Sequence, residues 1–210
     1  MGGGYKLSYF PIRGLAEPIR MLLVDQGIPF QDIRVTAEEW TKLKPTMHFG
    51  QMPCLHDGDM QIVQTGAILR HLARKHNLNG MTEMDATYAD MFYEGLRDLH
   101  TKYAKMIYQA YETEKDSFIK EVLPAELANF EKLLKTRSDG KHYILGENIC
   151  FADYALFEEL DIMQILSPSA LDQFPLLKAY HRRMLERSRI KSHYQKRAED
   201  KVPVNGNGKQ

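Results

Sequence analysis

The secondary-structure pattern of the sequence changes once, near residue 80, from mixed strands and helices to helices alone, and this change limits the folds that the chain can adopt. Before it, segments 5–10 and 30–35 read as strands, and the stretch after Gly14 predicts a helix that ends at Gly27. The order strand, helix, strand favours a parallel pair with a crossover helix. Segments 54–56 and 60–63 flank Asp57-Gly58-Asp59 and predict a hairpin, which a helix over 65–76 follows.

Residues 85–200 carry helical periodicity and almost no strand signal. A long helix through Tyr111 is predicted by apolar residues three or four positions apart, namely Phe92, Leu96, Leu99, Tyr103 and Ile107. Further helices are expected at about 115–136, 151–166, 175–187 and 190–199. We therefore expect an α/β domain over residues 1–80 and an all-helical domain over 81–210, joined by a linker near 80–86.

The charge balance and the lengths of the apolar runs limit the partners that the chain can have. Lys plus Arg and Asp plus Glu number 28 each, so the formal net charge is zero. A nucleic acid or an anionic membrane would call for a basic surplus, so neither is expected as a partner. No apolar run approaches the roughly 18 residues that cross a bilayer. The N-terminus has no apolar signal core, which makes the cytoplasm the expected location.

The cysteine and histidine spacings give no sign of a metal site. Cys54 and Cys150 form no CxxC pair, and the eight histidines show no HxxxH or HExxH spacing. Free thiols and no metal are the expectation. Cys150 and Asp153 have the spacing of a helix capping box, which is a structural feature. No base is indicated near Cys150, so a nucleophilic role is disfavoured.

Three short motifs have both a functional and a structural interpretation. Tyr9 ends the first strand, where open α/β folds place ligand-contacting groups, although an ordinary half-buried strand residue is the more frequent explanation for a tyrosine there. A cis bond before Pro53 would expose the main chain of Met52 to an extended ligand, but only about 5–6% of such bonds are cis. The helix start at Gln64-Thr65 suits a carboxylate, and a plain Thr cap explains it equally well.

Together these motifs resemble the glutathione transferases, and the pi class in particular. The resemblance covers nearly the whole chain from Tyr5 onward. The segments that carry it are 9–14, 49–53, 64–72, 97–99, 102–103, 107–108, 151–154 and 203–210, with Trp40 and Lys44. It implies a thioredoxin-like N-terminal domain, an all-α C-terminal domain and a homodimer. It also implies conjugation of glutathione, the co-substrate, to small hydrophobic electrophiles in detoxification.

The resemblance assigns roles to particular residues. Tyr9 would donate its O–H to the glutathione sulfur and is the implied catalytic residue. The implied glutathione-binding residues are Tyr9, Trp40, Lys44, Gln51, Met52, Pro53 (in cis), Gln64, Thr65 and, from the other subunit, Asp98. The implied electrophile pocket consists of Phe10, Ile12, Ala104, Tyr108 and Gly206. Phe49 would insert into the partner subunit near Met91, Phe92 and Gly95.

The chain departs from the family pattern at several positions. Thr65 stands where Ser is usual, which keeps the hydroxyl. Leu15 stands where Arg is common, so one polar contribution to the site is lost. Ala104 replaces a larger aliphatic residue and should enlarge the pocket, and segment 40–51 is two residues shorter than in many members. Cys150 replaces the usual Ser or Thr of the capping box, which should cost about 1 kcal/mol of helix stability.

The implied chemistry is activation of a thiol. A thiol with a pKa near 8.5 is mostly protonated at pH 7, and a donor aimed at the sulfur lowers that pKa. The donor must keep its proton, which a tyrosine pKa near 10 ensures. A non-catalytic protein that binds apolar ligands on the same fold is the alternative. A dithiol reductase is excluded, because Tyr9 stands where a cysteine would be needed.

Overall fold

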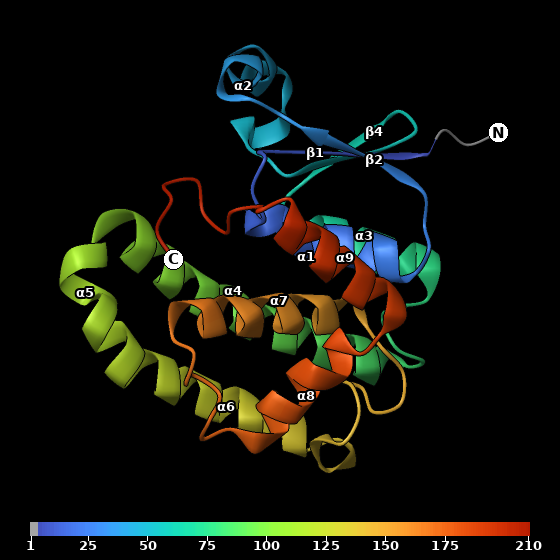
Figure 1. The fold of residues 1–210 in the computed structure, drawn as a ribbon. Helices are drawn as coiled ribbons and strands as arrows, with labels where there is room; N and C mark the ends of the chain where they lie inside the picture. The colour runs from blue at the N-terminus through green and yellow to red at the C-terminus, as the bar shows by residue number, and fades with distance from the viewer. Residues whose placement is uncertain (1–3) are drawn as a thin grey trace. The chain divides into compact units, whose positions relative to one another are not determined.

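The computed structural model describes residues 4–210 and divides into two compact units (Figure 1). The first contains the chain up to His76 together with Arg187–Gly206. The second contains Asn77–Glu186 and Asn207–Gln210. The last long helix thus groups with the first unit, whereas the sequence pattern had assigned it to the helical domain. The division at residues 80 and 81 stays a prediction.

A four-stranded mixed sheet forms the centre of the first unit. Its strands, in the order β2-β1-β3-β4, are β2 (Phe30–Arg34), β1 (Tyr5–Tyr9), β3 (Cys54–Asp57) and β4 (Met60–Val63). Strand β1 runs parallel to β2 and antiparallel to β3, and β3 and β4 form the hairpin. The parallel pair and the hairpin predicted from the sequence are both confirmed. Tyr9 lies opposite Arg34 at the carboxyl end of β1.

Four helices accompany this sheet: α1 (Glu17–Asp25), α2 (Ala37–Leu43), α3 (Thr65–His76) and α9 (Ser188–Glu199). Figure 1 shows α1 and α3 on one side of the sheet and α2 on the other. Leu7 of β1, Leu22 of α1 and Leu69 of α3 are fully buried, which places the apolar core on the α1/α3 side. A 3-10 turn, Gly14–Ala16, leads from β1 into α1.

Helix α2 was missed by the sequence pattern. It buries none of its seven residues, so it has no apolar face to generate a helical period. Its sequence signal is the capping box, in which Thr36 Oγ1 accepts from the Glu39 amide (3.3 Å) and the Glu39 carboxylate accepts from the Thr36 amide (2.8 Å). This helix carries Trp40, a predicted binding residue.

The second unit is helical. Its elements are α4 (Glu83–Gln109), α5 (Tyr111–Ser117), a π-helix (Phe118–Val122), α6 (Leu123–Lys135), α7 (Phe151–Leu166) and α8 (Pro175–Leu185). Helix α7 has the predicted bounds and is buried along most of its length. The single helix expected over 115–136 instead consists of α5, the π-helix and α6. Within residues 4–210, no helix is long and apolar enough to cross a membrane.

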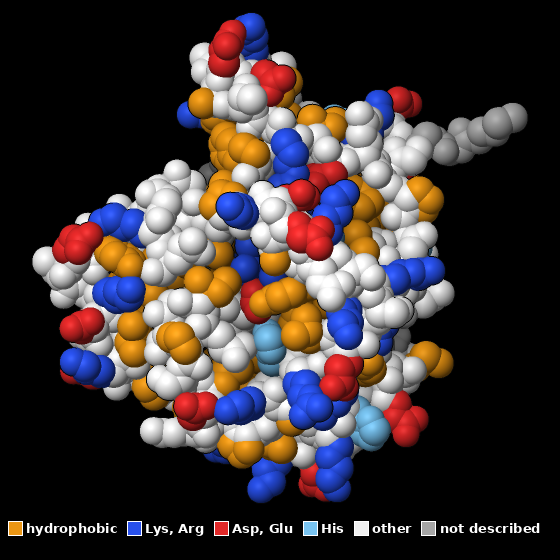
Figure 2. All heavy atoms as spheres, viewed as in Figure 1, with side chains coloured by type: hydrophobic (Ala, Val, Ile, Leu, Met, Phe, Trp, Pro, Cys, Tyr) orange, Lys and Arg blue, Asp and Glu red, His pale blue; other side chains and the backbone are white. Residues whose placement is uncertain are grey.

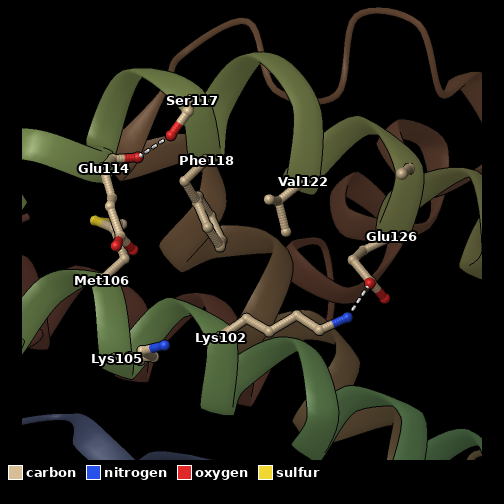
Figure 3. Close-up of a pocket in the computed structure, with 9 residues that line it drawn as sticks. Lys102, Lys105, Met106, Glu114, Ser117, Phe118, Val122 and Glu126 are labelled. Carbon is tan, nitrogen blue, oxygen red and sulfur yellow. Dashed lines mark hydrogen bonds and ion pairs between the residues drawn. The ribbon is translucent and has the colours of Figure 1, made fainter. Parts of the chain in front are cut away.

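A hollow of about 440 Å³ lies between α4 and the α5–α6 segment of the second unit (Figure 3). Met106, Phe118 and Val122 supply its apolar lining, and Lys102 pairs with Glu126 beside it. None of the predicted site residues lines this hollow. On the face drawn in Figure 2, basic and acidic side chains are interspersed, in keeping with the zero net charge.

Candidate active site

Tyr9 is held at the end of β1 by the turn that follows it. The residue is only 7% exposed, and its hydroxyl oxygen accepts a hydrogen bond from the Leu15 amide (3.2 Å). Gly14 has a φ of +45°, and a Cβ there would lie 2.7 Å from the Tyr9 hydroxyl oxygen. Such a contact is far too short, so only glycine lets the Tyr9 side chain lie where it does. The turn therefore fixes the position of the hydroxyl.

Thr65 binds the main-chain carbonyl of Leu15, the residue whose amide binds Tyr9. Its Oγ1 donates to the Leu15 carbonyl (3.2 Å), and Thr65 is buried at the start of α3. Leu15 thus joins Tyr9, through its N–H, to Thr65, through its C=O. Sequence reasoning considered only the lost Arg side chain at this position. No sequence signal could have revealed this role, because every residue type except proline supplies the same main-chain N–H and C=O groups.

Met52 presents its main chain beside the sheet. The Met52–Pro53 peptide bond is cis, and Pro53 is buried just before β3 begins. Within residues 4–210, neither the N–H nor the C=O of Met52 has a hydrogen-bond partner in the protein. The structure therefore has the cis bond that the resemblance implied, and it leaves a main-chain donor and acceptor for an extended ligand.

Two glutamines approach each other near this strand. The Gln64 amide nitrogen donates to the Gln51 side-chain oxygen (2.9 Å), and both side chains are exposed. Gln64 has a φ of 71° and its carbonyl accepts the Ile68 amide in the first turn of α3 (3.0 Å). The structure thus brings two predicted binding residues, Gln51 and Gln64, into direct contact.

Trp40 and Phe10 contact each other in the first unit. Their rings meet edge to face with centroids 5.8 Å apart, and the Phe10 ring meets that of Tyr9 at 5.5 Å. Trp40 also packs against a small buried cluster that includes Met47 and Cys54. Lys44 is exposed in the 3-10 turn after α2. A row of aromatic rings thus runs from Tyr9 to Trp40.

The remaining predicted residues lie elsewhere in the chain. Asp98, Ala104 and Tyr108 are on α4 of the second unit, and Gly206 is in the C-terminal segment of the first. Ala104 and Tyr108 are one helical turn apart and so share a face of α4. Tyr108 is 53% exposed, an unusual degree for a large aromatic side chain. Among residues 4–210, no group of metal-ligating side chains is arranged to hold an ion.

The two cysteines are free and buried. Burial raises the pKa of the Cys54 thiol to about 11, and burial with the adjacent Asp153 charge raises the pKa of Cys150 well above the ordinary value. A thiol is nucleophilic only as the thiolate. Neither cysteine side chain is therefore a nucleophile near neutral pH.

We expect the native protein to resist alkylation by iodoacetamide at pH 8, because both thiols stay protonated below their raised pKa values. Intact-mass spectrometry should find almost no adduct in the native chain and two adducts after unfolding in urea. Reactivity should increase only as the pH approaches 11, the pKa of Cys54. Rapid alkylation of Cys54 in the folded protein at pH 8 would contradict this assignment.

Comparison with known proteins assigns both parts of the chain to one family. A family model for the glutathione S-transferase N-terminal domain matches residues 5–74, and one for the C-terminal domain matches residues 97–197. The glutathione S-transferase 2 of Onchocerca volvulus is 65% identical over 206 residues, covering 98% of this chain and 99% of that protein. The human glutathione S-transferase P is 42% identical over 208 residues, covering 98% and 99%.

The structural comparison agrees. A solved structure of the pi-class glutathione S-transferase from Onchocerca volvulus matches with a TM-score of 0.98 and 63% identity, covering 99% of this chain and all of the other. The chain therefore belongs to the glutathione S-transferase family. Within that family its resemblance to the pi class, noted in the sequence, is confirmed.

Proposed function

We propose that this chain is a transferase that joins the thiolate of glutathione to hydrophobic electrophiles, with the Tyr9 hydroxyl stabilising the thiolate. The observation that carries the proposal is the hydrogen bond from the Leu15 amide to the Tyr9 oxygen (3.2 Å). A hydroxyl offers one donor and two acceptor positions. Acceptance of an amide N–H polarises the phenol and makes its O–H a stronger donor.

Thiolate stabilisation of this kind accounts for a large part of the expected rate. A thiol pKa near 8.5 leaves only a few per cent of thiolate at pH 7. Lowering that pKa by about two units corresponds to about 2.7 kcal/mol, within reach of one O–H···S⁻ bond in a partly buried site. Holding the thiolate next to the electrophile supplies the rest. Tyr9 keeps its proton throughout, so glutathione provides the nucleophile.

Glutathione would bind along the first unit in an extended form. The N–H and C=O of Met52 suit the cysteinyl main chain, and the start of α3 at Gln64 and Thr65 suits the γ-glutamyl carboxylate. Trp40, Lys44 and Gln51 would take the glycyl end, where the exposed Lys44 ammonium suits a carboxylate. The residues proposed to contact the electrophile are Phe10, Ile12, Ala104, Tyr108 and Gly206.

The alternative of a non-catalytic binding protein is not favoured, because the relatives at 58–65% identity are named glutathione S-transferases. A direct assay separates the two functions. We expect the purified chain to conjugate glutathione to a generic aryl halide with saturation in both substrates. Saturable binding of an apolar dye without measurable conjugation of an aryl halide, an alkenal or a hydroperoxide would support the binding protein instead.

The exposed Phe49 supports a homodimer in which Asp98 reaches the glutathione of the other subunit. Phe49 is 81% exposed, and Met91, which the resemblance places opposite it in the partner subunit, is 51% exposed, so a partner subunit would remove apolar surface from water at both residues. We expect Phe49→Ala to raise the dimer dissociation constant by roughly 100-fold, because about 2–3 kcal/mol of apolar burial is lost. Sedimentation equilibrium measures this, with Met60→Ala, a change at another exposed residue, as the control. An unchanged dissociation constant would remove Phe49 from the interface.

A detoxifying role in the cytoplasm completes the proposal. Two free cysteines suit a reducing compartment, where disulfides are rare. The raised thiol pKa values also suit an enzyme that handles electrophiles, because its own side chains compete poorly with bound glutathione for them. Fluorescence imaging of the tagged chain tests the location, and secretion or organelle enrichment would contradict it.

A further inference from the structure

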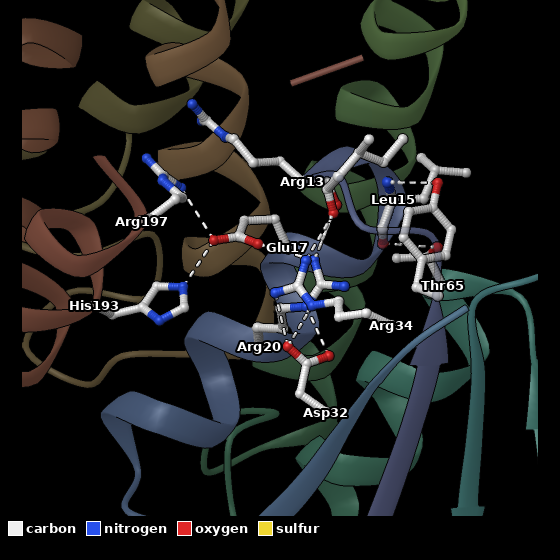
Figure 4. Close-up of polar contacts among 11 residues, drawn as sticks. Arg13, Leu15, Glu17, Arg20, Asp32, Arg34, Thr65, His193 and Arg197 are labelled. Carbon is white, nitrogen blue, oxygen red and sulfur yellow. Dashed lines mark hydrogen bonds and ion pairs between the residues drawn. The ribbon is translucent and has the colours of Figure 1, made fainter. Parts of the chain in front are cut away.

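A buried arginine holds the turn that positions Tyr9. Arg20 of α1 is fully buried, and its Nη1 donates to the carbonyls of Ile12 (2.9 Å) and Arg13 (3.3 Å). These two residues lead directly into Gly14 and Leu15, which contact the Tyr9 side chain and its hydroxyl. Figure 4 shows the Arg20 side chain extending from α1 beneath this turn. The guanidinium therefore restrains the turn through its carbonyl groups.

The C-terminal segment restrains the same turn through its amides. Arg13 N–H donates to the Pro203 carbonyl (2.9 Å), and Gly14 N–H donates to the Val204 carbonyl (3.2 Å). Pro203 and Val204 follow α9 and belong to the same compact unit as the turn. The main-chain groups before Leu15 are thus bonded on both sides, which leaves the Leu15 amide little freedom to move relative to the Tyr9 oxygen.

Glu17 links Arg20 to α9. Its Oε2 pairs with Arg20 Nη1 (3.0 Å), and its Oε1 accepts from His193 Nε2 (2.7 Å) and Arg197 Nη1 (3.2 Å). Burial alone would raise the pKa of this carboxyl, but the His193 hydrogen bond and the Arg20, His193 and Arg197 charges lower it well below its usual range. Glu17 therefore stays ionised at every pH at which an enzyme of this kind is assayed.

Strand β2 completes the arrangement. Asp32 accepts from Arg20 Nε (3.1 Å) through one oxygen and pairs with Arg34 Nη2 (2.7 Å) through the other. Arg34 Nη1 also donates to the Ile12 carbonyl (3.3 Å). The position of the Arg20 guanidinium is thereby fixed from three elements, namely β2, its own helix and, through Glu17, α9.

Stability alone is a weak reason for such a residue. Arg20 Nη2 is buried without a hydrogen-bond partner among residues 4–210. An unpaired buried donor costs about 1–3 kcal/mol, and apolar residues of similar volume often replace buried ion pairs without loss. Arg20 is better explained by its hydrogen bonds to the carbonyl groups of the turn. Its guanidinium carbon lies 5.8 Å from the centroid of the Tyr9 ring.

We propose that Arg20, held in place by Glu17 and α9, is a positioning residue that keeps the Gly14–Leu15 turn against the Tyr9 hydroxyl. The inference rests on the proposed function of Tyr9 and extends it. Arg20 does not touch the substrate. It acts through the Ile12 and Arg13 carbonyls, and its loss lets the Leu15 amide move away from the hydroxyl that it polarises.

The test measures the pKa of the bound glutathione thiol by titrating the ultraviolet absorbance of the thiolate in the binary complex. The variants are Arg20→Met, Arg20→Lys and Glu17→Gln, each also in the Tyr9→Phe background. Arg187→Gln is the matched control, because Arg187, the N-cap residue of α9, pairs with Asp25 of α1 (2.7 Å) and so joins the same two helices through other residues. A merely structural role of α9 would affect control and test variants alike.

We expect Arg20→Met to raise the bound thiol pKa by about one unit, half of the shift attributed to Tyr9. Glu17→Gln should raise it by less, Arg20→Lys should restore part of the loss, and Arg187→Gln should leave it unchanged. In the Tyr9→Phe background the Arg20 variants should add nothing, because they act through the missing hydroxyl. If Arg20→Met does not fold, Glu17→Gln decides, since it keeps the size of the side chain and removes only its charge.

The outcomes separate the two proposals. A raised thiol pKa in Tyr9→Phe but unchanged values in Arg20→Met and Glu17→Gln would overturn the positioning role and leave Tyr9 in place. An unchanged thiol pKa in Tyr9→Phe itself would overturn the proposed function. Equal shifts of the thiol pKa in Arg187→Gln and Glu17→Gln would mean that α9 supports the fold in general. They would contradict a specific effect of Glu17 on Arg20.

Discussion

Replacement of Tyr9 by phenylalanine is expected to lower the conjugation rate at pH 6.5 by about 50-fold, with little change in glutathione binding. The variant keeps the ring that contacts Phe10 and loses only the hydroxyl that the Leu15 amide polarises. If this hydroxyl lowers the thiol pKa by about two units, its loss removes about 2.7 kcal/mol of thiolate stabilisation. The proposed contacts of glutathione with Met52 and Gln64 remain.

The pH dependence gives the sharper measurement. A lowered thiol pKa means that the wild-type rate rises with pH through about 6.5 and then levels off, because the bound thiol is already ionised. In Tyr9→Phe the thiol returns to a pKa near 8.5, so the rate should keep rising to about pH 9. The ratio of wild-type to variant kcat should therefore shrink from about 50 at pH 6.5 to about 1 at pH 9.

Tyr5→Phe is the matched control for this experiment. Tyr5 is buried on the same strand, four residues earlier, and its hydroxyl bonds to His76 Nε2 (3.0 Å) far from the turn. Tyr5→Phe also removes one phenolic oxygen, yet its rate and pH profile should stay those of the wild type. Equal losses in Tyr5→Phe and Tyr9→Phe, or an unchanged pH profile in Tyr9→Phe, would show that Tyr9 does not stabilise the thiolate.

Local patterns were sufficient to predict most of the fold. The hairpin around Gly58 and the helices over 65–76 and 151–166 follow from turn residues and apolar spacing, which act within a few positions of the chain. The π-helix was not predictable, since Phe118–Val122 continues the spacing of its neighbours and differs only in hydrogen bonding. Helix α9 was predicted as a helix, but nothing local indicated that it groups with the first unit.

The candidate site was predictable to the extent that its side chains carry a motif. Tyr9 and Pro53 were identified through the family resemblance, and the structure places Tyr9 against the turn and Pro53 after a cis bond. The Leu15 amide could not be identified, because the residue type at a position does not indicate what its main-chain N–H binds. The pairing of Glu17 with His193 joins positions 176 apart, and buried charges with such distant partners show no periodicity.

Replacement of Asp153 by alanine is expected to lower the stability of the protein by about 3–5 kcal/mol. Asp153 is fully buried at the start of α7 and accepts three hydrogen bonds: from the amides of Cys150 (2.7 Å) and Ile144 (2.9 Å) and from the Tyr180 hydroxyl (2.7 Å). The alanine variant leaves the two buried amides without an acceptor, while the Tyr180 hydroxyl keeps the main-chain carbonyl of residue 153 (3.1 Å). Each unpaired buried donor costs about 1–3 kcal/mol. The loss is a large share of a typical stability of 5–15 kcal/mol.

Thermal and urea unfolding measure this effect, with a drop in Tm on the order of 10 °C expected for a chain of this length. Asp172→Ala is the control, because Asp172 is exposed and its ion pair with Lys178 (2.7 Å) contributes little. Asp153→Asn should fall between the two, since its amide oxygen still accepts but carries no charge. A loss below about 1 kcal/mol in Asp153→Ala would mean that water replaces the carboxylate at the three donors. The capping box would then contribute no more than the weak thiol cap of Cys150 suggests.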